Sequence, residues 1–137
     1  MSIGQREAIM LVLPLPGNFG NARGHWAAQY RAKLGYQRKV LAVAGKPPKK
    51  PWAKVTIKAT FYVWAKMDPD NAQARLKHVL DALKAVRRIP VGPRRWKMMM
   101  GSGWFLDDHP GCLLGLEVEQ VVDRKNQRLE VTISPLA

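Results

Sequence analysis

The sequence predicts a single α+β domain in which two helices cover one face of a mixed β-sheet. Three observations support this fold class. Several short segments have the pattern of buried or half-buried strands, two longer segments have a helical pattern, and connectors rich in Pro and Gly separate them. The expected order is strand, helix, strand, helix, strand, strand. With 137 residues the chain is long enough for one hydrophobic core, so residues 1–137 are expected to form one domain.

The first half of the chain supplies the first strand and the first helix. Residues 9–13 are continuously apolar, and Pro14 and Pro16 end this strand because proline has no backbone N–H to donate to a sheet. Residues 25–43 have a helical composition, with an apolar side made of Trp26, Tyr30, Leu34 and Leu41. The basic, proline-rich residues 45–51 are expected to form an irregular connector.

The second half supplies the remaining elements. Residues 55–64 alternate apolar and polar side chains, which predicts a half-buried strand. The following helix has one apolar face, formed by Ala72, Leu76, Val79, Leu80 and Leu83. Residues 114–118 and 129–133 alternate as strands do, and the polar residues 123–127 between them predict a turn. We therefore expect these last two strands to form a hairpin.

The composition is strongly basic and indicates an anionic partner. Lys and Arg total 23 against 10 Asp and Glu, which gives a formal net charge of +13. Nucleic acid is the commonest partner of so basic a domain, and a membrane surface is less favoured because the basic residues are spread along the whole chain. Cys112 is the only cysteine, which excludes an intrachain disulfide and argues against a structural zinc site. A reducing cytoplasmic setting fits this composition best.

Two aspartates, Asp68 and Asp70, lie where the second strand gives way to the second helix, and they have two interpretations. In the structural one, Asp70 caps the helix, Gln73 completes a capping box, and Lys77 and Asp81 form an i,i+4 ion pair. In the functional one, the two neighbouring carboxylates repel each other unless a cation lies between them. A divalent cation would then bridge them to a phosphate.

A second acidic pair, Asp107 and Asp108, lies further along the chain. An isolated Asp-Asp pair is usually a polar turn. It becomes part of a metal site only if the chain folds back to place it beside Asp68 and Asp70.

At these residues the chain resembles the RusA family of Holliday junction resolvases, small dimeric crossover-junction endodeoxyribonucleases of bacteria and phages. The resemblance covers about residues 11–133. Its pieces are Leu-Pro-Leu-Pro at 13–16 followed by Asn18 and Asn21, Asp-Pro-Asp-Asn at 68–71 with Leu-Lys at 76–77 and Asp-Ala-Leu at 81–83, and Leu-Asp-Asp at 106–108. The Asp-x-Asp-Asn helix of the phage-type members is the most specific piece.

The resemblance implies a site and its partners. Asp68, Asp70 and Asp108 would be Mg²⁺ ligands, with Asp107 as the alternative to Asp108 and Mn²⁺ as a substitute metal. A family lysine with a catalytic or DNA-contacting role falls at Ala74 in some members, and Lys77 is the nearest candidate here. The implied substrate is four-way branched DNA, cut by a homodimer in the cytoplasm of a bacterial or phage-infected cell during recombination and repair.

Residues 87–103 form a basic insertion where family members usually have a short turn, and five of these residues are Arg or Lys. They are either a tolerated surface loop or an added DNA-contacting loop, and we favour DNA contact. The expected DNA contacts over the whole chain are Asn18, Asn21, Arg23, Arg75, Lys77, Arg94, Arg95, Trp96 and Lys97. Two other functions stay open, a non-catalytic binder of structured nucleic acid and a metal-dependent nuclease of other specificity.

Overall fold

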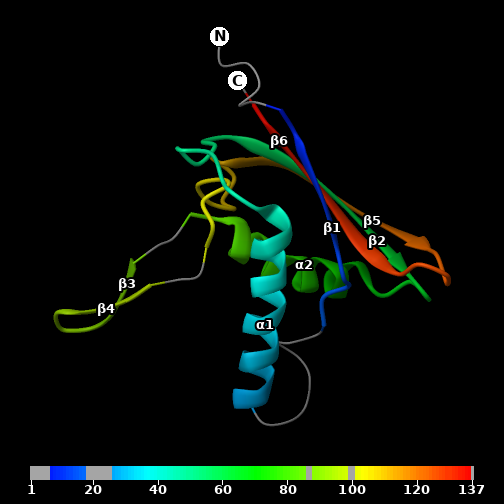
Figure 1. Cartoon of the computed structure of the whole chain (residues 1–137), viewed down its shortest axis with the longest axis horizontal. Coiled ribbons are helices and arrows are strands. Elements are labelled where there is room, and N and C mark those ends of the chain that lie inside the picture. Colours follow the sequence, from blue (N-terminus) through cyan, green and yellow to red (C-terminus); the bar gives the residue numbers. More distant parts are fainter. Residues whose placement is uncertain (1–6, 18–25, 86–87, 99–100, 137) are drawn as a thin grey trace.

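The computed structural model describes residues 7–17, 26–85, 88–98 and 101–136. The elements follow in the predicted order, with two further strands in the basic insertion (Figure 1). They are β1 (Ile9–Leu13), α1 (Trp26–Ala44), β2 (Val55–Val63), α2 (Pro69–Leu83), β3 (Arg88–Gly92), β4 (Arg95–Met98), β5 (Leu113–Val122) and β6 (Arg128–Pro135). None of the helices in this part of the chain is long and apolar enough to cross a membrane.

Four strands form a mixed sheet in the order β1-β6-β2-β5, so the predicted fold class is confirmed. β6 runs antiparallel to both β1 and β2, whereas β5 runs parallel to β2. The predicted hairpin between the last two strands is wrong, because β2 lies between β5 and β6. The five residues 123–127 are long enough to cross the roughly 10 Å that separates two strands flanking a third.

The core lies between this sheet and the two helices, which lie on one side of it (Figure 1). Strand β2 buries every second residue from Val55 to Val63, as its alternating sequence predicts. The predicted apolar face of α2 is confirmed, since Ala72, Leu76, Val79, Leu80 and Leu83 are all buried. These side chains belong to the same core cluster as the buried side chains of β2.

The buried side of α1 agrees with the predicted one in part, since Leu34 and Leu41 are half-buried and Leu41 packs against the core. Trp26 is 75% exposed and Tyr30 is also exposed, whereas Tyr36, Gln37 and Val40 are buried. Gln37 donates a 3.0 Å hydrogen bond from Nε2 to the backbone oxygen of His78 in α2, which satisfies its buried amide. The prediction was therefore wrong at Trp26 and Tyr30, and it missed Gln37, a polar residue that lies between Leu34 and Leu41 on the same side of the helix and has a partner on α2.

The basic insertion contains a two-stranded antiparallel hairpin, not the loop that we expected. Pro90 pairs with Trp96 and Gly92 with Arg95, and the register shifts between them. Arg94 occupies the turn with a φ of 55°. This hairpin projects away from the helices and the main sheet (Figure 1). We call residues 88–98 the β3–β4 arm.

Candidate active site

The first two aspartates of the predicted site lie at the start of α2. β2 and β5 are parallel, so their carboxyl ends meet at one edge of the sheet, and β2 leads from this edge to Asp68. Asp68 is the N-cap residue and Pro69 opens the helix, because proline presets φ and lacks an N–H that the first helical turn would leave unpaired. Asp70 lies in the first turn. The predicted cap at Asp70 with a capping box to Gln73 is therefore wrong, since the cap is Asp68 and the helix begins two residues earlier than predicted.

The carboxylates of Asp68 and Asp70 are both exposed. Asp68 makes no side-chain capping hydrogen bond, and no ion pair joins either aspartate to another residue in the described part of the chain. The positive end of the α2 dipole favours negative charge here. Two carboxylates two residues apart, with no cation from the described residues between them, are thus available to an outside cation.

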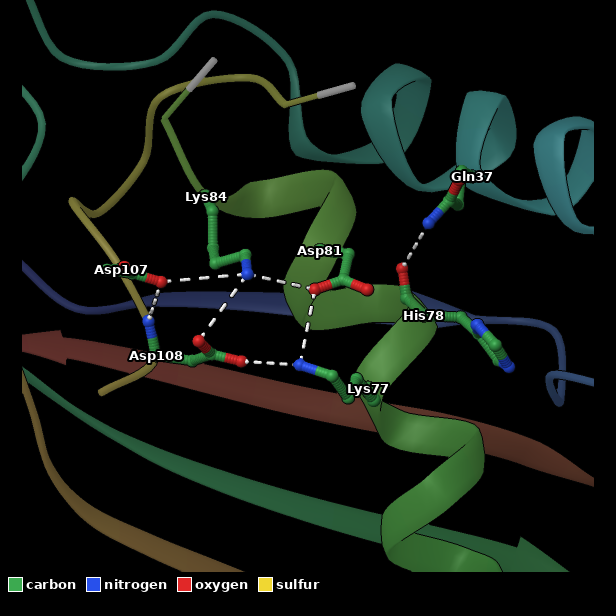
Figure 2. A network of polar contacts seen from close by, with 7 residues as sticks. All are labelled: Gln37, Lys77, His78, Asp81, Lys84, Asp107 and Asp108. Atoms are coloured by element: carbon green, nitrogen blue, oxygen red, sulfur yellow. Dashed lines mark hydrogen bonds and ion pairs between the residues drawn. The ribbon is translucent and has the colours of Figure 1, made fainter. Parts of the chain in front are cut away.

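The third predicted ligand, Asp108, belongs to a network of two lysines and three aspartates (Figure 2). Lys77 Nζ lies 3.0 Å from Asp108 Oδ2 and 3.6 Å from Asp81 Oδ1. Lys84 Nζ lies 3.0 Å from Asp81, 3.6 Å from Asp107 and 3.4 Å from Asp108. The predicted i,i+4 pair of Lys77 and Asp81 is confirmed, and it is one edge of this larger network.

The two lysines of this network differ in burial. The side chain of Lys84 is 13% exposed, whereas that of Lys77 is 59% exposed. Lys84 therefore acts as a fixed internal counterion, while Lys77 reaches the network from the solvent side. Among the described residues, the network joins two ammonium groups to three carboxyl groups.

The electrostatics of the network keep Asp108 ionised. Burial alone would raise the pKa of Asp108, but the hydrogen bond from Lys77, the neighbouring Asp107 and the charge of Lys84 together lower it to about 2. The same hydrogen bond raises the pKa of Lys77 above its ordinary value, against the opposing effect of desolvation. Both groups are therefore fully charged at neutral pH.

Backbone contacts hold the second acidic pair against the end of α2. Trp104 donates a 2.9 Å hydrogen bond to the carbonyl of Leu83, and Ala85 donates one of 2.9 Å to Phe105. Phe105 is completely buried and anchors the segment in the core. The turn is thus folded back onto α2, as the functional interpretation required, but at the carboxyl half of the helix.

The structure does not bring Asp108 to Asp68 and Asp70. Asp108 contacts α2 at Lys77, which lies seven residues after Asp70, or about 10 Å along the helix. Among the described residues, no group of three or more His, Cys, Asp or Glu side chains is arranged to hold a metal ion. The carboxylates of Asp68 and Asp70 fit Mg²⁺ chemically. The carboxylate of Asp108, the predicted third ligand, is instead paired with the two lysines Lys77 and Lys84.

Lys84 is the residue of this site that sequence reasoning missed. It directly follows the Asp-Ala-Leu segment at 81–83, and on the helix it lies three residues after Asp81. That spacing could have identified one ion pair. Its contacts with Asp107 and Asp108 depend on the return of a distant segment, which no local pattern reveals.

The predicted DNA-contacting residues have several different settings. Arg75 is engaged within the molecule, since Nε bonds Asn71 Oδ1 and Nη1 bonds the carbonyl of Pro16, both at 3.3 Å. Arg94, Arg95 and Trp96 are exposed on the β3–β4 arm. Three predicted contacts, Asn18, Asn21 and Arg23, lie outside the described residues, and of Lys97 only the backbone is described.

Comparison of the chain with protein-family models and with curated proteins found no match.

Proposed function

We propose that this chain is a Mg²⁺-dependent, structure-selective endodeoxyribonuclease that resolves four-way DNA junctions in recombination and repair. The observation that carries the proposal is the pair of exposed carboxylates, Asp68 and Asp70, at the start of α2 in a chain of net charge +13. Acidic side chains are scarce in this chain, and two of them lie at the carboxyl edge of parallel strands with no counterion among the described residues. The resemblance of residues 68–71 to the RusA helix supports the same conclusion.

Asp68 and Asp70 would hold the metal, with Mn²⁺ as a substitute for Mg²⁺. When bound, Mg²⁺ polarises a phosphate and lowers the pKa of a bound water. Asp108, or Asp107 in its place, could join them only after giving up its lysine partners. Lys77 is exposed enough to leave Asp108 for a DNA phosphate, whereas Lys84 is not.

The other cations of the chain suit the same substrate. Arg94 and Arg95 on the β3–β4 arm carry charge well away from the core, where a phosphate backbone could meet it. Symmetric cutting of a four-way junction requires two active sites related by a two-fold axis, so we propose a homodimer. The setting that this function implies is the cytoplasm of a bacterial or phage-infected cell.

The test is cleavage of a synthetic four-way junction, compared with a flap, a linear duplex and a single strand, in Mg²⁺ and in EDTA. We expect the junction to be cut in Mg²⁺ alone. Asp70→Asn should abolish cutting while junction binding persists or tightens, because a negative charge near the phosphate is lost. The matched control is Glu119→Gln, which makes the same change of charge on an exposed side chain of β5. An Asp70→Asn protein that cuts normally would refute the site.

A second function is favoured by the lysine network itself. Asp81, Asp107 and Asp108 are all paired with Lys77 or Lys84, as in a site that serves stability alone. In that case the chain is a non-catalytic binder of structured nucleic acid. The same assay separates the two functions, since such a binder would retain the junction and cut it in neither Mg²⁺ nor Mn²⁺.

A further inference from the structure

An exposed tryptophan lies at the carboxyl ends of β2 and β5, outside the lysine network. Trp64 directly follows β2 and is 56% exposed. Arg124, from the turn between β5 and β6, places its guanidinium carbon 4.9 Å from the centre of the Trp64 ring. Its Nε also donates a 3.4 Å hydrogen bond to the Trp64 carbonyl. We call these two residues the Trp64–Arg124 pair.

The segment that carries Trp64 is held in place by β5. The side-chain amide of Gln120 makes two 2.8 Å hydrogen bonds to the backbone of Met67, accepting from its N–H and donating to its carbonyl. Asp123 N donates a 2.9 Å bond to the Val63 carbonyl. Trp64 precedes Asp68 by four residues, which is at most about 13 Å of extended chain. An exposed aromatic ring is thus fixed close to the first candidate metal ligand.

The charge of Arg124 is available to a ligand, in contrast to that of the nearby Arg128. Arg128 is neutralised by Asp123 at 3.1 Å and by Glu130 at 2.7 Å, and it lies over the Tyr62 ring at 3.7 Å. Within the described ranges, Arg124 makes no such ion pair. Arg128 is therefore part of the internal structure of the turn. Arg124 places a cation that has no ion-pair partner among the described residues over one face of the Trp64 ring.

An aromatic ring with a cation beside it is the combination that binds unstacked nucleobases. Stacking on an aromatic side chain is largely independent of base identity, and the cation contacts the adjoining phosphate. Bases within a continuous duplex are already stacked on both sides, so they offer no free face. A branch point offers one, since base pairs there lose a stacking neighbour.

We propose that the Trp64–Arg124 pair receives an unstacked base at the branch point of a DNA junction. The base would stack on Trp64, and Arg124 would contact the phosphate next to it. This inference rests on the proposed function, because it takes branched DNA as the substrate and Asp68 as the neighbouring site. It gives the chain a means of preferring a junction over a linear duplex, independently of any metal.

The test is equilibrium binding in EDTA, where no cleavage takes place, to a four-way junction and to a linear duplex of the same arm sequence. Trp64→Leu keeps an apolar side chain and removes the aromatic face. We expect it to weaken junction binding about tenfold and to leave duplex binding within about twofold. Trp64→Phe should restore junction binding to within about threefold, since a phenyl ring still stacks.

The matched control is Tyr30→Leu, which removes another exposed aromatic ring with a cation near it, Lys33 Nζ at 5.1 Å. This variant should not change the ratio of junction to duplex affinity. The proposal is overturned if Trp64→Leu binds both DNAs as the wild type does, if it weakens both equally, or if Trp64→Phe gives no recovery. Cleavage by the wild-type protein in Mg²⁺ tests the nuclease function separately. If the wild type cuts junctions but Trp64→Leu binds them with unchanged affinity, this inference is refuted and the nuclease function is not.

Discussion

Lys84→Met should destabilise the fold in the absence of any metal or DNA. The substitution keeps most of the length of the side chain and removes the ammonium group that contacts Asp81, Asp107 and Asp108. Lys77 would remain in contact with Asp81 and Asp108. The loss of one partner from a fully buried ion pair costs about 3–5 kcal/mol. These carboxylates are 19–27% exposed, so we expect a loss of about 2 kcal/mol in the free energy of unfolding.

The measurement is thermal and urea unfolding in EDTA at neutral pH. For a domain of this size, about 1 kcal/mol corresponds to about 4 °C in Tm, so the expected fall is about 8 °C. Lys77→Met is the matched control on the same helix. Because Lys77 is mostly exposed, its substitution should cost at most about 1 kcal/mol.

The pH dependence of the loss provides a second check. The pKa of Asp108 is lowered to about 2 in the folded protein, from an ordinary value of 3.8. Stabilisation by its ion pairs is therefore complete above about pH 3.8 and is lost as the pH falls through about 2. The difference in the free energy of unfolding between wild type and Lys84→Met should therefore become smaller as the pH falls over that range. If Lys77→Met proves more costly than Lys84→Met, or if the difference widens in acid, the assignment of Lys84 as the internal counterion is wrong.

Three further predictions concern stability and DNA binding. Gly101→Ala should lower the Tm, because a Cβ there would lie 2.3 Å from the Lys84 carbonyl oxygen. Gly35→Ala, inside α1, meets nothing within 4 Å and should add about 0.5–1 kcal/mol to the free energy of unfolding. Equal Tm values for the two variants would contradict the close approach at Gly101. Tyr36→Phe should cost about 1 kcal/mol in urea unfolding, because the buried phenol donates a 2.7 Å hydrogen bond to the Pro14 carbonyl; an unchanged midpoint would argue against that bond. Arg95→Ala should reduce the slope of log K against log salt for junction DNA by about one, as expected for one lost phosphate contact; an unchanged slope would remove the β3–β4 arm from the interface.

The sequence was informative wherever a local pattern decides the structure. Helix α2 and its buried face follow from spacing alone, and so does the position of Asp68 and Asp70 at its start. The alternation of β5 and β6 identified both as strands. It did not reveal that β2 separates them, because alternation determines which side chains share a face and not which strands are neighbours.

The rest of the candidate site depends on contacts between distant segments. Asp108 pairs with Lys77 across 31 positions of the chain and with Lys84 across 24. In sequence, Lys84 is one of many lysines of a basic chain. The segment anchored by Phe105 returns to the end of α2 and brings Asp107 and Asp108 to the ammonium group of Lys84.

The place of β6 inside the sheet has a consequence for how the chain folds. β6 is the last strand in the sequence, yet it lies between β1 and β2, and Leu129 pairs with both Leu13 and Phe61. Among the described strands, β1 pairs with β6 alone, so during synthesis it cannot form this pairing until residues 128–135 have left the ribosome. Such long-range pairing is slow, because the entropy of closing the loop is lost before the contacts form. We therefore expect the sheet to close late, with the apolar strand β1 unpaired until β6 has been synthesised and open until then to chaperones or to aggregation.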